Sequence, residues 1–289
     1  MTEDRRQKSE GRLVRLAIAA AACVSLGWAQ DTEKITLPFS NPAGPHKLVV
    51  NALQGSVTVK GYEGRDVIVE YSPGAGPGIN RGNRRRPAEP PPPGMHRIGG
   101  NRDFDMTESN NTVTLKTGMF APVGNVVIQT PADTSVTVKT MAGQAINIDN
   151  ISGEVDANNM NGTVTITNAS GAVVAHSMNG KVVALLNRVP PDKMMSFSTM
   201  NGDVDVTLPA DSKATFKMRA DNGDIFTDFD VKLETQSAPQ VEEEKDKNGR
   251  TRRRVRADGT ETGSVNGGGP EIQFKNFNGS IYIRKAGVK

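Results

Sequence analysis

A tripeptide that usually ends in Asn-Gly recurs along the chain, and this repeat constrains the fold more than any other feature of the sequence. It occurs six times, as Met141-Ala142-Gly143, Met160-Asn161-Gly162, Met178-Asn179-Gly180, Met200-Asn201-Gly202, Asp221-Asn222-Gly223 and Phe277-Asn278-Gly279. Successive glycines are 19, 18, 22, 21 and 56 residues apart. A nearly constant step of this length is typical of an architecture in which one structural unit stacks on the next. The last step corresponds to one period plus an insertion.

The residues between the tripeptides alternate between apolar and polar, as in "GTVTITN", "GDVDVTLP" and "GSIYIRK". A period of two residues indicates a strand with one buried face. A second turn signal falls halfway through each unit: Ser152-Gly153 and Ser170-Gly171 come early, and the longer "RVPPD" and "PADS" come later. No stretch beyond residue 29 keeps a helical period. The sequence therefore predicts an all-β, single-domain, right-handed β-solenoid, a stack of two-strand coils.

Stacking the coils in sequence order places equivalent residues in columns that face the core. Before the glycine turn the columns are Val136, Val155, Val173, Met195, Phe216 and Ile272; then Val138, Ala157, Ala175, Phe197, Met218 and Phe274; then Thr140, Asn159, Ser177, Thr199, Ala220 and Asn276. After the turn the opposite wall consists of Val164, Ile166, Val182, Ala184, Val204, Val206, Ile281 and Ile283. Because the later coils carry larger side chains, the core should widen towards the C-terminus. Ile146 and Ile148 are one residue out of phase, which indicates a β-bulge.

The turn residues have a structural role in this interpretation. Asn and Gly both tolerate positive φ, so the pair makes a sharp corner, and stacked asparagines can form hydrogen bonds from coil to coil. The predicted turn residues are Gly143, Asn161, Gly162, Asn179, Gly180, Asn201, Gly202, Asn222, Gly223, Asn278 and Gly279. A ligand-binding stripe of the same asparagines is the alternative. The strands would display outward residues such as Thr163, Thr165, His176 and Lys181.

The first 29 residues have the pattern of a secretory signal peptide. Basic residues precede the apolar run "LAIAAAACVSLGWA", and Gly27-Trp28-Ala29 fits a cleavage site after Ala29. The single cysteine, Cys23, follows three alanines rather than the leucine that begins a lipobox, so a lipoprotein is not favoured. Removal of the segment leaves 30 basic and 29 acidic residues. We therefore expect an exported protein, in the periplasm, on the cell surface or in the medium, that does not bind nucleic acid.

Composition divides the rest of the chain. Two stretches, one rich in Pro, Gly and Arg and one rich in charge, contain too few apolar residues to form a core. The predicted segments are a signal peptide (1–29), N-terminal strands or a cap (30–72), a disordered insertion (73–102), solenoid repeats (103–235), a charged flexible insertion (236–270) and the strands of the terminal coil (271–289).

The stretch "VVIQTPADTSVTVKTMAG", followed by repeated G-x-V-x-[VI]-x-N and Asn-Gly turns, resembles the bacterial putative-adhesin family of secreted β-strand-repeat domains of unknown function. The resemblance covers residues 35–285 apart from the two insertions. It implies a β-solenoid. It implies no catalytic residue, because the shared motif consists of turn and core positions.

Two kinds of acidic site have to be weighed. Calcium rolls place aspartates near turns, as Asp203, Asp205, Asp224, Asp228 and Asp230 are placed, but the equivalent positions in other coils are Thr163, Lys181 and Ser280. A β-helical carbohydrate-active enzyme would need converging carboxylates, and Asp156, Asp203 and Asp205 could share one face. Aspartates that alternate with valine are also what a solvated strand face requires. We therefore expect neither a metal site nor a catalytic site.

The remaining polar candidates are scattered. His46, His96 and His176 are too far apart in the pattern to form a metal or triad site, and we expect them at the surface. Tyr62, Tyr71 and Tyr282 are the only tyrosines, which disfavours a lectin-type aromatic platform. The runs Arg84–Arg86 and Arg252–Arg254 could make weak contact with an anionic surface. The alternative is a solvated loop balanced by Glu242, Glu243 and Glu244.

We expect a non-catalytic, exported protein of the envelope or cell surface with adhesin-like recognition or scaffolding as its role. It would need no cofactor, and its partner would be an unidentified protein or polysaccharide of the surface or envelope. An envelope-associated regulatory or polymerising scaffold, whose solenoid ends stack, is the first alternative. A carbohydrate-active β-helix enzyme is the second.

Overall fold

The structure is a computed structural model that describes residues 33–73, 104–117, 124–234, 240–245, 251–256 and 259–287. The predicted signal peptide with Ala29, and the Pro/Gly/Arg-rich insertion from residue 74 onward with His96, lie outside the described residues. The described residues form strands, turns and loops without a helix, which confirms the predicted all-β class. None of them forms a helix with the length and apolar character needed to cross a bilayer.

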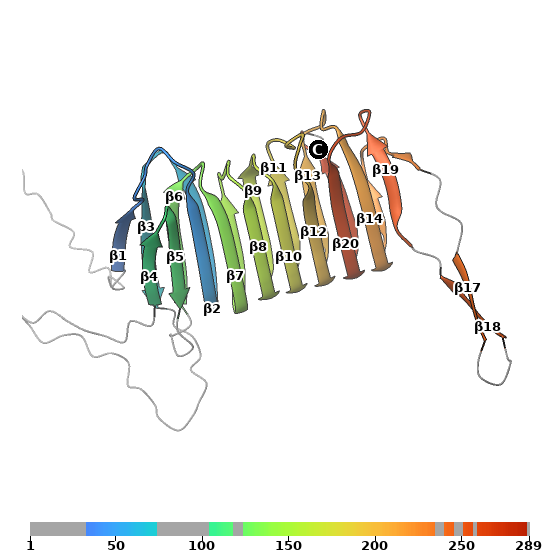
Figure 1. The fold of residues 1–289 in the computed structure, drawn as a ribbon, viewed down its shortest axis with the longest axis horizontal. Helices are drawn as coiled ribbons and strands as arrows, with labels where there is room; N and C mark the ends of the chain where they lie inside the picture. Colours follow the sequence, from blue (N-terminus) through green and yellow to red (C-terminus); the bar gives the residue numbers. More distant parts are fainter. Residues whose placement is uncertain are drawn as a thin grey trace, which may run out of the picture. The chain divides into compact units, whose positions relative to one another are not determined.

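The strands form two facing walls, which Figure 1 shows from one side. Wall 1 runs in the order β4 (Phe104–Ser109), β5 (Thr112–Thr117), the first half of β2 (Lys47–Tyr62), the first half of β7 (Ser135–Asp149), β8 (Val155–Asn161), β10 (Val173–Asn179), β12 (Met195–Asn201), β20 (Glu271–Asn278), β14 (Ala214–Asn222), β19 (Glu261–Val265) and β16 (Lys232–Leu233).

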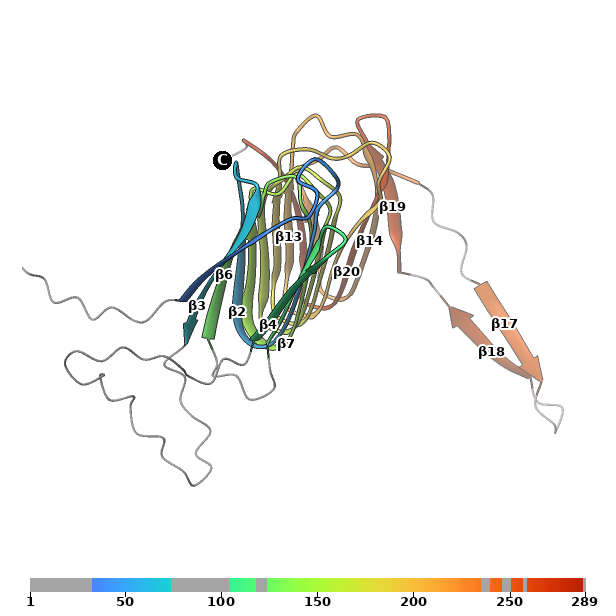
Figure 2. The same ribbon diagram turned by 60° about the vertical axis from the view of Figure 1, so that its left-hand side comes forward.

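Wall 2 comes into view when the molecule is turned (Figure 2). It consists of β1 (Glu33–Pro38), β3 (Asp66–Pro73), β6 (Gly124–Pro131), the second halves of β2 and β7, β9 (Thr163–Ala169), β11 (Val182–Leu186), β13 (Val204–Leu208), β21 (Ile281–Lys285) and β15 (Ile225–Thr227). The two walls belong to one 19-stranded sheet, because β2 and β7 each pass from one wall to the other.

The predicted bulge lies at the corner that β2 and β7 share. Gly55 pairs with Gly143, but the next matched pair is Val57 with Ile146, so β7 carries one extra residue. The extra residue brings Ile146 and Ile148 back into phase with the core, where both are buried. The irregular spacing in the sequence therefore marks a real irregularity of the sheet.

The last coil does not stack at the end, where sequence order placed it. β20 pairs with β12 on one side and with β14 on the other, and β21 lies in the same way between β13 and β15. After β15 the chain contributes β16 and β19 to the end of wall 1, and β20 then lies between β12 and β14 (Figure 1). The predicted inward columns contain the right residues, but their order along the stack is different. The coil of residues 271–285 is next to last rather than last.

The range 236–270, expected to be flexible, contains three described strands. β17 (Gln240–Lys245) and β18 (Thr251–Arg256) pair as an antiparallel hairpin. β19 pairs antiparallel with β14, and its Val265 is buried. The expectation fails for β19 because this segment carries its own apolar residue and covers the edge of the last coil.

The space between the walls is filled by the predicted inward columns. Their apolar members are no more than 3% exposed, apart from Ala220, which is partly buried against the same core. The early coils fill the space with valine, alanine and isoleucine, and the late coils with phenylalanine. The rings of Phe197 and Phe216 lie 5.8 and 5.4 Å from that of Phe274, which sits between them in the stack. The core is therefore continuous across the coil that returns.

The third column is polar and buried apart from Ala220, and three of its side chains tie a coil to the turn of the coil before it. Ser177 Oγ donates to the Gly162 carbonyl at 2.9 Å, and Thr199 Oγ1 donates to the Gly180 carbonyl at 2.8 Å. Asn276 Nδ2 continues the pattern to the Gly202 carbonyl at 2.8 Å. Such hydrogen bonds offset the cost of burying polar groups, so these three side chains help to fix the register of the turns.

Candidate functional site

The turn asparagines form a ladder along one edge of the stack. Asn179 Nδ2 donates to Asn161 Oδ1 at 2.9 Å, and Asn201 Nδ2 donates to Asn179 Oδ1 at 2.8 Å. Asn278 then donates to Asn201 at 2.8 Å, and Asn222 donates to Asn278 at 3.1 Å. Each interior member uses one donor and one acceptor on its neighbours. This arrangement is the coil-to-coil hydrogen bonding that the sequence predicts.

The glycines beside the ladder bring successive turns into close contact. A Cβ added to Gly202 would lie 2.5 Å from the Gly180 carbonyl oxygen, and Gly202 has a φ of 144°. Both the spacing and the conformation exclude a side chain there. The turn glycines are explained by packing between coils.

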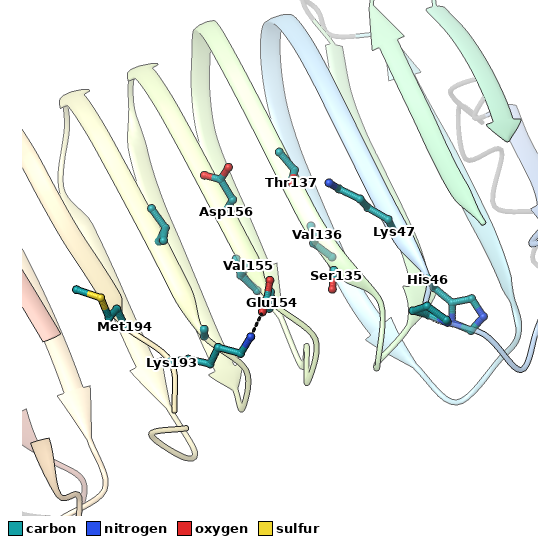
Figure 3. Close-up of a pocket in the computed structure, with 13 residues that line it drawn as sticks. His46, Lys47, Ser135, Val136, Thr137, Glu154, Val155, Asp156, Lys193 and Met194 are labelled. Atoms are coloured by element: carbon teal, nitrogen blue, oxygen red, sulfur yellow. Dashed lines mark ion pairs between the residues drawn. The ribbon is translucent and has the colours of Figure 1, made fainter. Parts of the chain in front are cut away.

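A groove of about 610 Å³ lies on the outer face of wall 1, where β2, β7, β8 and β10 begin (Figure 3). Its floor displays Ser135, Thr137, Glu154, Asp156, Ala172 and Val174. One end is bounded by His46 and Lys47, and the other by Lys193 and Met194. Four strand steps separate β2 from β12, so the groove crosses about 19 Å of sheet at about 4.8 Å per step.

The groove carries both signs of charge and some apolar surface. Lys193 Nζ lies 3.2 Å from Glu154 Oε1, and both side chains are more than half exposed. An exposed pair of this kind adds little stability and can exchange partners. Val174 is 45% exposed and Met194 is 67% exposed. The groove therefore offers alternating polar and apolar contacts to a ligand lying across the strands.

His46 is the least expected residue at this groove. Its side chain is only 5% exposed, and its ring stacks on Phe39 with centroids 4.4 Å apart. Neither ring nitrogen forms a hydrogen bond, although Asp133 Oδ1 lies 3.5 Å from Nδ1. The expectation that His46 lies at the surface is wrong, because the loop before β2 folds it against Phe39.

Lys193 and Met194 form the other end of the groove, and sequence reasoning did not identify either as a functional residue. Their loop, "NRVPPDKM", replaces the short Ser-Gly turn of the earlier coils. A longer turn that carries Lys193 and Met194 was the available signal. The sequence pattern identified it only as a longer turn between two strands.

The outer face of wall 2 carries ion pairs. Asp203 Oδ2 lies 2.8 Å from Lys181 Nζ, and its Oδ1 accepts from the Ser280 backbone N–H at 3.2 Å. These two hydrogen bonds lower the pKa of Asp203 below its ordinary value, the contact with Lys181 having the larger effect. Asp205 accepts two hydrogen bonds from Arg284, at 2.8 and 3.2 Å. Both aspartates are therefore matched to cations of neighbouring strands.

The acidic candidates do not converge. Asp156 lies on β8 of wall 1, whereas Asp203 and Asp205 lie at β13 of wall 2, so the idea that the three share a face is wrong. Asp228 Oδ1 accepts from the Lys285 backbone N–H at 2.7 Å. Within the described ranges, no three His, Cys, Asp or Glu side chains are grouped so that they could hold a metal ion.

Two other predicted features have a clear place. Tyr282 stacks on Phe226 with ring centroids 5.3 Å apart, and the Arg284 guanidinium lies 5.3 Å from the Tyr282 centroid, so the tyrosine ring is in contact with both neighbours.

In the β17–β18 hairpin, the backbone register places Glu242, Glu243 and Glu244 opposite Arg254, Arg253 and Arg252. The first run, Arg84–Arg86, lies outside the described residues.

These features define a class of protein, a two-walled β-solenoid with a filled core and a groove on one outer face. The chain belongs to the Toastrack DUF4097 family, whose model matches residues 22–263. This membership agrees with the resemblance to a putative-adhesin family of unknown function.

Two crystal structures are similar to this chain over most of its length. A putative cell adhesion protein from Clostridium sporogenes ATCC 15579 is 12% identical, with a TM-score of 0.39, and the match covers 88% of this chain and 99% of that one. A putative adhesin from Bacteroides fragilis NCTC 9343 is 10% identical, with a TM-score of 0.37, and the match covers 89% and 98%. No curated protein matches the sequence.

Proposed function

We propose that the protein is a non-catalytic recognition protein of the cell envelope or surface, and that it binds an extended polypeptide segment of a surface partner in the groove on wall 1. The groove is the observation that carries this proposal. The groove is long and shallow. Two lysines, Lys47 and Lys193, and two acidic residues, Glu154 and Asp156, lie along its length. A globular ligand would match it poorly, but a chain lying across the strands could follow it.

The lining favours a peptide over a polysaccharide. Sugar rings usually pack on exposed aromatic faces, and no aromatic residue except His46, which is stacked on Phe39, lines this groove. Alternating apolar and charged positions, such as Val174 beside Asp156, match the alternating side chains of an extended peptide.

Two valines in the same coil give a matched test. Val174 points outward on β10 inside the groove, and Val183 points outward on β11 of the other wall. We expect Val174→Arg to fill the groove and weaken binding to peptide arrays of surface proteins at least tenfold. Val183→Arg should leave binding unchanged. Equal effects of the two variants, or binding to glycan arrays alone, would contradict the proposal.

We also propose that the protein is exported and that residues 1–29 are removed after Ala29. The basic and apolar pattern of this segment supports the proposal. Mass spectrometry of protein taken from the native envelope and medium should give a chain that begins at Gln30. A chain that retains residue 1 and is found only inside the cell would overturn this part.

A further inference from the structure

A row of methionines runs along the outer face of wall 1, beside the asparagine ladder and away from the groove. Its members are the residues before the turn dipeptides: Met141, Met160, Met178 and Met200, which are 54%, 38%, 37% and 47% exposed. Large apolar side chains exposed at the same position of successive strands are not explained by core packing. The function proposed above does not use them.

The register places three of these methionines on adjacent strands. Asn159, Ser177 and Thr199 pair in line before them, and Asn161, Asn179 and Asn201 pair in line after them. Met160, Met178 and Met200 therefore lie side by side on β8, β10 and β12, at about 4.8 Å per strand step. Because the asparagine ladder holds these turns together, the three thioethers start from fixed backbone positions.

A nitrogen ligand lies in the same place. His176 precedes Met178 by two residues on β10, so both side chains point outward on the same face. Its Nδ1 lies 2.9 Å from Ser198 Oγ, which orients the ring. With Nδ1–H donating to Ser198, Nε2 is the nitrogen left to bind a metal.

The charges on the neighbouring strands make the middle of the methionine row the most favourable position for a cation. In the neighbouring outward positions the strands carry Lys139, Asn158, His176, Ser198 and Lys275 in that order. The lysines lie two strands from His176 on either side. A cation is therefore repelled least at β10, where the nearest neighbours on each side are neutral.

We propose that Met160, Met178 and Met200, together with His176, bind a single soft monovalent cation, Cu(I) or its analogue Ag(I). Thioether sulfur is a neutral, polarisable ligand that selects Cu(I) over hard ions such as calcium or magnesium. Imidazole is an accepted ligand for copper, and three sulfurs and one nitrogen complete a four-coordinate site. Methionine is flexible enough to close around an ion from neighbouring strands.

The probe should be Ag(I), which is redox-inert, titrated into the full chain with Cys23→Ala in every variant so that the thiol does not compete. We expect one tightly bound ion, with shifted methyl resonances for Met160, Met178 and Met200 when the methionine methyl groups carry carbon-13. Met178→Leu nearly conserves volume and should weaken binding at least tenfold. His176→Gln should also weaken it.

Met194→Leu is the matched control, because Met194 is the most exposed of the described methionines but lies outside the row. It should leave the affinity unchanged. Thermal unfolding of each variant shows whether the fold is kept. Wild-type affinity in a folded Met160→Leu, Met178→Leu, Met200→Leu triple variant would overturn the proposal. So would equal losses from Met178→Leu and Met194→Leu.

Discussion

At the scale of single residues, the turn asparagines act through their side chains rather than through their backbone conformation. Among the described residues, the asparagines with positive φ are Asn110, Asn111, Asn150, Asn168 and Asn266, and none of these belongs to the ladder. In the ladder turns the positive φ is carried by glycines such as Gly162 and Gly279. Asparagine is therefore required there for its amide, which donates and accepts along the stack.

The ladder predicts unequal costs for removing its members. Asn201 has a ladder partner on both sides, whereas Asn222 is at the end and has only Asn278. We expect Asn201→Ala to lower the free energy of unfolding by about 1 kcal/mol and Asn222→Ala by about half as much, since each net hydrogen bond contributes on that order. Urea denaturation of both variants measures the difference. Equal costs would mean that the second ladder hydrogen bond of Asn201 adds no stability.

The walls predict a sharp contrast between neighbouring residues on β9. Val164 is completely buried, whereas Thr163 points outward. Val164→Asp should lower the free energy of unfolding by more than about 3 kcal/mol, because it places an unpaired charge in the core. Thr163→Asp should change it by less than about 0.5 kcal/mol. Circular dichroism melts compare the two, and similar tolerance of both would contradict the assigned faces.

Residue faces could be predicted because alternation is a local property. Every inward column that the sequence indicates lies in the core, since a shift of one residue would expose a whole strand face. The burial of His46 was not accessible in the same way. It depends on a contact with Phe39 across a loop that has no periodicity. The groove was missed for the same reason, because its two ends come from loops.

At the scale of elements, the returning coil of β20 and β21 acts as an internal layer rather than as a cap. It separates β12 from β14 and β13 from β15, and Phe274 contacts the phenylalanines on both sides. Sequence spacing could not reveal this position, because the coil has the same length and pattern wherever it is inserted. The position is set by the pairing of β20 with β12 on one side and with β14 on the other.

This position predicts the effect of a truncation. Removal of residues 271–289 should expose both Phe197 and Phe216, whereas loss of a terminal cap would expose one face only. We expect rapid hydrogen exchange in β12, β13, β14 and β15, with protection kept in β8 and β9 of the middle coils. Mass spectrometry of exchanging amides tests this. Protection retained in β12 and β13 would show that the coil adds little to its neighbours.

At the scale of the whole molecule, antiparallel strands cover several of the parallel edges. At the N-terminal side β4 lies antiparallel to β5, and β1 to β3. At the other side β19 covers β14, and the two-residue β16 follows it. An antiparallel or very short edge strand blocks the addition of another parallel coil. The structure therefore does not favour a scaffold that grows by stacking coils end to end.

A monomer is the expected state over a wide range of concentrations. Multi-angle light scattering should give the mass of one chain at both low and high concentration. Filaments that lengthen with concentration would show that the edge strands fail to block pairing. In that event the polymerising scaffold would be the better account of the protein.

The ladder also has a consequence for chemical ageing. In flexible peptides, Asn-Gly is prone to cyclise, because the glycine nitrogen attacks the asparagine side-chain carbonyl and releases ammonia. In the stack these nitrogens are engaged: Gly162 and Gly180 donate to the carbonyls of Asn179 and Asn201, each at 2.8 Å. The amides under attack are held by their neighbours. The folded protein should therefore keep its asparagines far longer than its sequence suggests. The rate of deamidation at these turns should depend on how often a coil unfolds locally.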